Sequence, residues 1–153
     1  MKESWQGGVH TYLGMLCSGF PNTFMVYSPQ GICPKVPPSL LVKTDFSIAP
    51  TALSNGPTIL ECQVDFVCET IAKLEKEKAK SIEPLVSAEE DWKSMIQAMN
   101  APTLFPLTSS WWTGGNIPGK KAESLTYVLG IDRYEAQCRE TLTDWKGFEV
   151  VAA

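Results

Sequence analysis

The sequence contains 153 residues, which is enough for one average domain, because domains usually comprise about 100–200 residues. Two complete nucleotide-binding domains therefore do not fit within it. Hydrophobic residues make up 44% of the chain and charged residues 20%, which are ordinary values for a globular protein and exclude wholesale disorder.

Charge and hydrophobicity exclude two classes of partner. Thirteen Lys and Arg against 17 Asp and Glu give a net charge of −4, and the basic residues are dispersed, so we expect no nucleic-acid partner. No apolar run approaches the roughly 20 residues that span a bilayer, and the first residues lack the apolar centre of a signal peptide. We therefore expect a cytoplasmic protein with no membrane partner.

The cysteines predict neither disulfides nor a metal site. Their number is odd, with 5 in the chain, and no two of them form a Cys-x-x-Cys pair. We expect buried thiols in a reducing compartment and no bound metal.

The first predicted element is a buried strand over Asn22–Tyr27, which Ser28 and Pro29 end. Ligands often lie where a strand runs into such a loop. The next segment, residues 31–49, contains three prolines that forbid a helix, and its composition differs from that of both neighbours.

Two amphipathic helices are predicted next. Thr58 and Glu61 have the spacing of a capping box, and the helix that follows places on one face Leu60, Val64, Val67, Ile71 and Leu74. Its far end, Lys73 to Lys80, alternates Lys and Glu and should face solvent. Ser87 and Glu90 repeat the capping spacing before a second helix, which should end near Asn100 and has on one face Trp92, Met95, Ile96 and Met99.

The C-terminal third is predicted to begin with a glycine-containing loop over residues 104–121. A short strand over Leu125–Leu129, a helix over Tyr134–Leu142 and an extended piece over Phe148–Val151 should follow. The order is mixed α and β without internal repeats.

The residues predict no catalytic group within this chain. The only histidine is His10, for which a structural or surface role is expected. Glu89, Glu90 and Asp91 lie in a helical first turn, where they favour the helix dipole and do not indicate a paired acid and base. The sequence contains neither Gly-x-Gly-x-x-Gly nor Gly-x-x-x-x-Gly-Lys-Ser/Thr, so no phosphate-binding loop is predicted.

Trp111 and Trp112 form the one suggestive pattern. An indole offers an N–H donor and a flat apolar face, which suits a side chain that holds a ribose or nicotinamide and excludes water. Gly114, Gly115 and Gly119 would let this loop move. Spacing alone also allows simple anchoring of the loop in the core.

Several motifs resemble one family. Residues 110–120, Ser-Trp-Trp-Thr-Gly-Gly-Asn-Ile-Pro-Gly-Lys, resemble the segment Ser-Trp-x-x-Gly-Ala-Asn-Ile-Pro-Gly-Lys of Baeyer–Villiger flavoprotein monooxygenases, the family of cyclohexanone and phenylacetone monooxygenases. Trp5–Met15 and Gly19–Phe24 resemble the stretch after the Ala-Thr-Gly strand of the FAD domain. Pro50–Asn55 resembles the family's loop beside the flavin. The family's C-terminal tail is similar to this chain at Leu129-Gly130, Tyr134 and Gly147-Phe148. Residues 31–49 alone have no counterpart.

The resemblance implies an α/β fold. The chain would be an incomplete fragment of a flavoprotein monooxygenase with two dinucleotide-binding, Rossmann-like domains, and would comprise the C-terminal part of the FAD domain, C-terminal helices and a mobile loop. Residues 1–30 would end the FAD domain, 50–109 would hold the flavin-side loop and two helices, and 110–153 would hold the mobile loop and last elements. Residues 31–49 would interrupt the flavin loop, and a retained intron is one hypothesis for them.

The resemblance also implies an oxidoreductase that uses FAD and NADPH. Such an enzyme inserts one oxygen atom from O2 into a ketone, or oxidises a heteroatom, through a flavin C4a-peroxide. Trp111 would bond the nicotinamide ribose, accompanied in the loop by Asn116 and Lys120. Asn55 and Gly56 would contact the flavin, and the substrate side would be lined by Thr51, Ala52 and Ser54.

Because the family's phosphate loops have no counterpart here, we expect the isolated chain to be inactive and to need the missing domains. The alternative is a catalytically inactive product that acts only as a protein-interaction module, docking through the apolar face of the Leu60–Leu74 helix.

Overall fold

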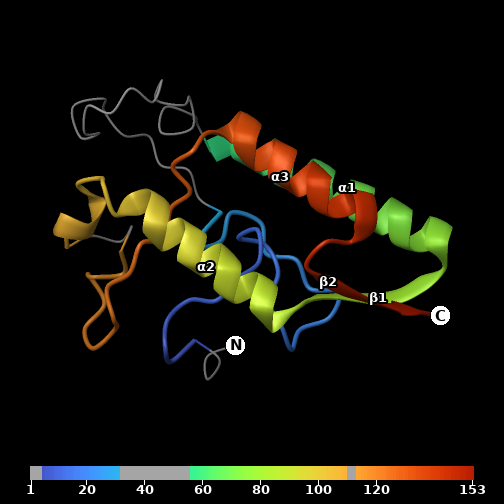
Figure 1. The fold of residues 1–153 in the computed structure, drawn as a ribbon, viewed down its shortest axis with the longest axis horizontal. Helices are drawn as coiled ribbons and strands as arrows, with labels where there is room; N and C mark the ends of the chain where they lie inside the picture. Colours follow the sequence, from blue (N-terminus) through green and yellow to red (C-terminus); the bar gives the residue numbers. More distant parts are fainter. Residues whose placement is uncertain (1–4, 32–55, 110–112) are drawn as a thin grey trace.

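The computed structural model describes residues 5–31, 56–109 and 113–153. In chain order, its elements are helix α1 (Gly56–Glu77), strand β1 (Ala79–Pro84), helix α2 (Val86–Asn100), the short 3-10 helix η3 (Phe105–Leu107), helix α3 (Ile131–Asp144) and strand β2 (Phe148–Ala152). Figure 1 shows α1 and α3 along one edge of the molecule and α2 on the other side of the N-terminal segment. The mixed α and β organisation that the sequence predicts is confirmed.

Helices α1 and α3 run in the same direction. Gln63, near the start of α1, donates a 2.9 Å hydrogen bond to Tyr134 near the start of α3. Near the other end of α1, the Lys73 ammonium donates to the Leu142 carbonyl and lies 4.2 Å from the Trp145 ring centroid. A cation at this position offsets the partial negative charge at the end of α3.

The strands that follow these two helices pair with each other. β1 and β2 form a two-stranded antiparallel sheet in which Ile82 lies opposite Val150 and Pro84 lies opposite Phe148. The Ala153 N–H continues the ladder by donating to the Lys78 carbonyl at 2.9 Å.

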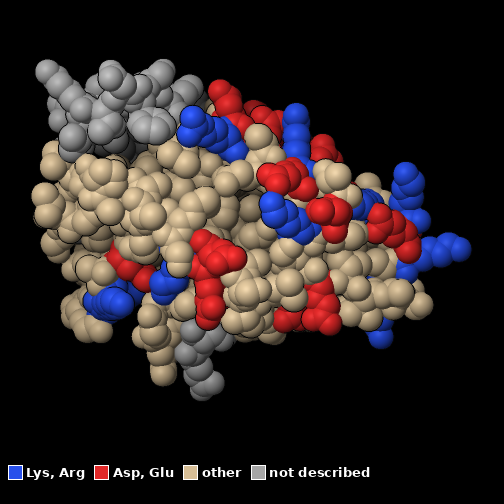
Figure 2. Space-filling model, in the orientation of Figure 1, with Lys and Arg blue, Asp and Glu red and all other residues tan. Residues whose placement is uncertain are grey.

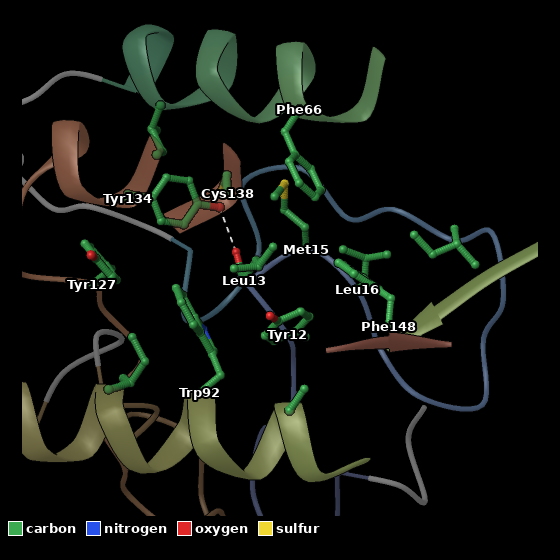
Figure 3. Packing of buried hydrophobic residues seen from close by; sticks show 14 residues of the cluster. Tyr12, Leu13, Met15, Leu16, Phe66, Trp92, Tyr127, Tyr134, Cys138 and Phe148 are labelled. Atoms are coloured by element: carbon green, nitrogen blue, oxygen red, sulfur yellow. Dashed lines mark hydrogen bonds between the residues drawn. The ribbon is translucent and has the colours of Figure 1, made fainter. Parts of the chain in front are cut away.

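The core lies between the α1–α3 pair and α2, and residues 12–16 pass through it (Figure 3). Leu13, Met15 and Leu16 are almost completely buried there. Aromatic rings link them to α2 and α3: the Trp92 ring stacks on Tyr127 with centroids 5.7 Å apart, and Tyr127 meets Tyr134 edge to face at 5.4 Å.

The predicted strand over Asn22–Tyr27 is wrong. Asn22 and Tyr27 have φ values of 57° and 59°, which are left-handed and incompatible with an extended strand. The backbone groups of this segment find separate partners: Asn22 N–H donates to the Ile82 carbonyl at 3.0 Å, and Met25 N–H to the Met15 carbonyl at 2.7 Å. Most of the segment is exposed or half-buried.

The predicted strand over Leu125–Leu129 is also absent, although this segment is mostly buried. Its backbone groups find partners in the Gln30 N–H, which donates to the Leu125 carbonyl at 2.7 Å, and in side chains of α2. Asn100 Nδ2 donates to the Thr126 carbonyl at 2.8 Å, and Gln97 Nε2 donates to the Ser124 carbonyl at 2.8 Å. These bonds satisfy buried backbone groups without a sheet.

The first amphipathic helix is confirmed as α1, but most of its predicted apolar face does not meet the core. Leu60, Val64 and Ile71 are 36%, 47% and 46% exposed. The buried side chains of α1 belong to an adjacent stripe: Ile59, Gln63, Phe66 and Thr70. Spacing predicts a stripe, but it does not decide which of two neighbouring stripes meets the core.

The remaining helices match the prediction closely. α2 ends at Asn100 and buries Trp92 and Ile96, and α3 and β2 include the predicted residues. The capping box at Ser87 and Glu90 is wrong, because α2 begins after Leu85 without a side-chain cap. Strand β1 was not predicted. Among the described residues, no helix has the length and apolar character needed to cross a bilayer.

Candidate functional site

The predicted nucleotide loop is described except for residues 110–112. It is built from tight turns: Ile117 N–H donates to the Gly114 carbonyl at 3.1 Å, and Lys120 N–H donates to the Ile117 carbonyl at 3.2 Å. Gly114 and Gly119 have φ values of 67° and 77°, a region that glycine adopts without steric cost. The glycines therefore shape this loop.

The base of the loop is anchored through Thr113. This residue is 3% exposed, its hydroxyl donates to the Thr108 carbonyl at 3.2 Å, and its carbonyl accepts from the Glu123 N–H at 2.9 Å. The loop thus has a fixed base, and its tip, residues 116–119, is exposed.

Asn116 and Lys120 are the described polar residues that the family resemblance assigns to the cofactor. The Asn116 side chain is exposed, and Lys120 is half-buried because its aliphatic part lies over Gly114, where a Cβ would be 3.6 Å from Lys120 Cδ. An amide and an ammonium group therefore belong to one loop, and both suit contact with a ribose or a phosphate. Trp111 lies outside the described residues.

A cluster of charged side chains holds the chain where this loop ends, at Glu123. The Glu123 carboxylate accepts from the Val9 N–H and lies 3.2 Å from the Lys93 ammonium. Lys93 Nζ lies 3.2 Å from His10 Nε2. His10 is thus part of a packing cluster beneath the loop, consistent with its expected structural role. Glu123 carried no motif that could have identified it.

Of the predicted flavin-side residues, only Gly56 is described; Thr51, Ala52, Ser54 and Asn55 lie outside the described residues. Gly56 is the first residue of α1, and a Cβ there would be 3.5 Å from the Tyr27 hydroxyl. The 22-residue helix has no acidic residue in its first turn, so no carboxylate there offsets the positive end of its dipole.

Two buried glutamines brace the chain on either side of residues 32–55. Gln63 Oε1 accepts from the Tyr27 N–H at 2.7 Å, and its Nε2 lies within 3.5 Å of the Gly31 carbonyl. Gln30 accepts from the Thr11 hydroxyl at 2.6 Å and donates to the Val9 carbonyl at 3.1 Å. Both glutamines are completely buried, and sequence reasoning missed them. On one flank, the Gly31 carbonyl is therefore bonded to Gln63, and on the other flank Gly56 begins the helix that carries Gln63.

The network continues from Gln63 into the core. Tyr134 accepts from Gln63 Nε2 and donates to the Leu13 carbonyl at 2.7 Å, the bond drawn in Figure 3. A fully partnered buried network specifies one arrangement of its groups. The only sequence signal for Gln63 was its position four residues after Ile59 and three before Phe66.

The buried acids and thiols do not form a nucleophilic site. Burial raises the pKa of Cys17 to about 11 and that of Cys62 to about 11, and burial also raises the pKa of Cys138. These thiols stay protonated at neutral pH and are poor nucleophiles. Cys68 differs from the expected buried thiols because it is exposed.

Glu89 lies in the first turn of α2, as expected, and it is buried. Its carboxylate accepts from the Ser18 N–H at 2.6 Å, and burial raises the pKa of the Glu89 carboxyl. Within residues 5–31, 56–109 and 113–153, no group of three or more His, Cys, Asp and Glu side chains suits a metal ion.

Curated relatives and solved structures that match this chain are the same kind of protein. No family model matches the chain. The chain is 33% identical over 153 residues to the FAD-binding monooxygenase acrE of Aspergillus aculeatus and covers 100% of its own length and 23% of that protein. It is 35% identical over 134 residues to a Baeyer–Villiger monooxygenase of Pseudooceanicola batsensis and covers 88% of its own length and 21% of that protein.

A solved structure gives the same result for the fold. Cyclohexanone monooxygenase from Rhodococcus sp. Phi1 bound to NADP+ matches with a TM-score of 0.80 and 31% identity, over 99% of this chain and 25% of that chain. This chain thus spans about a quarter of the length of the proteins that it matches.

Proposed function

Because the chain is related in sequence and fold to the Baeyer–Villiger-type flavin-containing monooxygenases, about a quarter of whose length it matches, we propose that it works as part of such an enzyme. The proposed reaction uses FAD, NADPH and O2 and inserts one oxygen atom into a ketone to give an ester or lactone. The observation that carries the proposal is the match over all 153 residues of this chain, at 33% identity and over 23% of the relative.

The described loop fits a nicotinamide dinucleotide. The loop carries the Asn116 amide at its exposed tip and the Lys120 ammonium next to the tip, while Thr113 and Glu123 fix its base. In the proposed enzyme, Trp111 donates its indole N–H to the ribose, and Asn116 and Lys120 contact the same cofactor. Bound NADPH supplies the hydride. The loop's own task is to hold the cofactor and exclude water.

The start of α1 fits the electron-rich ring of a reduced flavin. Its N–H groups and dipole favour negative charge, and no acidic residue of its first turn competes. We propose that Asn55 and Gly56 contact FAD and that the substrate side is lined by Thr51, Ala52 and Ser54. When bound, FAD supplies the reaction with O2. The described residues contribute position: Gln63 and Gln30 hold the flanks of this segment.

The relatives favour a ketone as substrate. Those named for their substrates include cyclopentanone 1,2-monooxygenase of Comamonas sp. and cyclohexanone 1,2-monooxygenase of Acinetobacter sp. A phenazine N-monooxygenase of Lysobacter antibioticus keeps heteroatom oxidation as the second candidate.

We propose residues 1–30, 31–49, 50–109 and 110–153 as the functional segments. We also propose a cytoplasmic location, in keeping with the free thiols.

The test is a chimera in which this chain replaces the aligned quarter of the Comamonas cyclopentanone monooxygenase. We expect it to retain flavin, to oxidise NADPH and to convert cyclopentanone into the lactone, while the isolated 153-residue chain oxidises no NADPH. Trp111→Ala and Lys120→Ala should raise the KM for NADPH by about tenfold, the effect of losing one good hydrogen bond, without loss of flavin. Lys121→Ala, an exposed neighbour, is the matched control.

Two results would contradict the proposal. A chimera that is yellow but indifferent to NADPH would remove the nicotinamide role of the loop. NADPH oxidation by the isolated chain would refute its expected dependence on further domains.

A catalytically inactive interaction module is the alternative, and the exposed aliphatic side chains of α1 favour it. A chimera that folds but neither retains flavin nor turns over would support this alternative.

A further inference from the structure

Helix α1 is apolar on two adjacent faces. Its inner face holds Ile59 and Phe66, which are 0% and 3% exposed. Its outer face holds Leu60, Val64 and Ile71, which are 36%, 47% and 46% exposed. At about 100° per residue, the two sets lie next to each other around the helix. A helix with an apolar surface wider than the face it buries is typical of a helix covered on both sides.

The outer aliphatic residues of α1 do not take part in the packing of its inner face. Two of its four buried side chains are polar and have partners: Gln63 bonds Tyr27 and Tyr134, and the Thr70 hydroxyl donates to the Phe66 carbonyl at 2.7 Å. The usual arrangement, with aliphatic residues inward and polar residues outward, is thus partly reversed. Exposed aliphatic side chains contribute little to the stability of this fold, because they remain in water.

The outer aliphatic residues form a continuous strip. Leu60, Val64, Val67 and Ile71 follow one another at steps of four, three and four residues, and Val67 is half-buried between its exposed neighbours. The strip extends about 16 Å along the helix. Acidic residues border it, since Glu61 and Asp65 each follow one of these aliphatic residues and are exposed. A matching surface would be apolar with basic residues at its margin.

The position of α1 leaves this strip accessible. α1 and α3 lie along one edge of the molecule in Figure 1, and α1 is in contact with α3 and β1. In Figure 2, charged side chains of both signs gather over the same edge, while the left side, near the end of α2, carries fewer. A strip of exposed aliphatic residues bordered by exposed acidic residues indicates an interface.

The relatives indicate what covers this strip. This chain matches 25% of the Rhodococcus cyclohexanone monooxygenase with a TM-score of 0.80, so three quarters of that protein lie outside the matched part. A fold of this size within a protein four times as long buries part of its own surface. We propose that the outer face of α1 is the docking surface for the remaining three quarters of the monooxygenase, so that α1 lies between two layers of the complete enzyme. This inference rests on the proposed function.

Docking at this face would also reach the predicted flavin side. The same helix holds Tyr27 and Gly31 through Gln63 and begins at Gly56, so fixing α1 also fixes both flanks of residues 32–55.

The experiment is co-expression of this chain with the Comamonas cyclopentanone monooxygenase from which the aligned quarter has been removed. We expect the two polypeptides to co-purify. The double variant Val64→Asp and Ile71→Asp should reduce the recovered complex at least tenfold, whereas Leu107→Asp, which changes an 81% exposed leucine on η3, should change it less than twofold. Circular dichroism of each isolated variant shows whether its helices form.

A second measurement covers the case in which the separate chains differ too much to associate. When the same substitutions are made in the chimera, the α1 double variant should have a lower Tm and a lower flavin content. The η3 variant should change neither. Equal effects of the α1 and η3 substitutions in both formats would overturn the proposal. So would a dimer of this chain alone, detected by light scattering and lost in the α1 variant, because the strip would then bind a second copy.

Association and turnover are read separately. A complex that forms through α1 but does not oxidise NADPH would remove the proposed function and leave the docking surface intact. An active chimera that tolerates the α1 substitutions would support the proposed function and overturn the docking surface.

Discussion

Gln63 on α1 and Tyr134 on α3 are joined by a 2.9 Å hydrogen bond, and both side chains are completely buried. The same glutamine accepts from the Tyr27 N–H, so one side chain connects two helices and the N-terminal segment.

Gln63→Leu should therefore destabilise the chain by about 1–3 kcal/mol, because it removes the bonds that the completely buried Gln63 side chain makes with the Tyr27 N–H and the Tyr134 hydroxyl. Urea denaturation measures the change. Asp65→Asn, an exposed substitution on the same helix, should stay within about 0.5 kcal/mol of the wild type. Equal stabilities of the leucine variant and the wild type would show that the network is not needed.

Gly147 should tolerate no side chain. Its φ is +80°, and a Cβ there would lie 2.6 Å from the Tyr12 ring and hydroxyl. Gly147→Ala should cost about 2–5 kcal/mol, combining left-handed strain with overpacking. Thermal denaturation can separate the two causes. Gly119→Ala has φ +77° in open space and should cost about 1–2 kcal/mol, whereas Gly7→Ala meets no atom within 4 Å and should be nearly neutral. A Gly147 variant no weaker than the Gly119 variant would argue against the clash.

Glu89 should give stability a specific pH dependence. Burial raises the pKa of the Glu89 carboxyl in the folded chain, so the folded state binds this proton more tightly than the unfolded state does. The contribution of Glu89 is thus largest below its ordinary pKa of about 4.3 and is lost as the pH rises through the raised pKa.

Glu89→Gln removes this titration but keeps an oxygen that can accept from the Ser18 N–H. The free energy of unfolding of the glutamine variant, relative to that of the wild type, should therefore increase as the pH rises across this window. Denaturation curves at several pH values measure it, with Glu90→Gln, an exposed neighbour, as the control. A constant difference across the window would contradict the prediction.

The thiols should react in a fixed order. Cys68 is exposed, Cys62 is partly buried, and Cys17 and Cys138 are buried. Burial also raises the pKa of the last three thiols and lowers their thiolate fraction. Among these four described cysteines, N-ethylmaleimide under native conditions at neutral pH should modify Cys68 first and Cys138 last, as peptide mass spectrometry can determine. Early modification of Cys138 would show that α1 and α3 separate readily.

Sequence reasoning succeeded where a long periodic pattern met a clear end. α2 and α3 each carry such a pattern, and β2 follows a turn at Gly147. It failed where distant partners decide the structure. The Asn22 N–H donates to the carbonyl of Ile82, far along the chain, and Asn22 lies in a turn. The Leu125 carbonyl accepts from the Gln30 N–H and the Thr126 carbonyl from Asn100 Nδ2, and both partners are distant in the sequence.

The candidate site shows the same division. The glycine turns of the nucleotide loop follow from local sequence, whereas the buried roles of Gln30, Gln63 and Glu123 do not. Each of these three residues finds a partner at least 19 residues away in the sequence, so no local pattern reveals it. A polar residue in a helix is usually exposed, and only the packed fold shows that Gln63 is not.

The bracing of Gly31 and Gly56 bears on how this gene could tolerate change. The Gly31 carbonyl is bonded to Gln63, and Gly56 begins the helix that carries Gln63, so added residues between them mainly increase the entropy cost of closing that segment, by about 0.6 kcal/mol for each doubling of length. An insertion of the size of residues 31–49 could therefore persist through evolution without unfolding the rest of the chain, even if it abolished turnover.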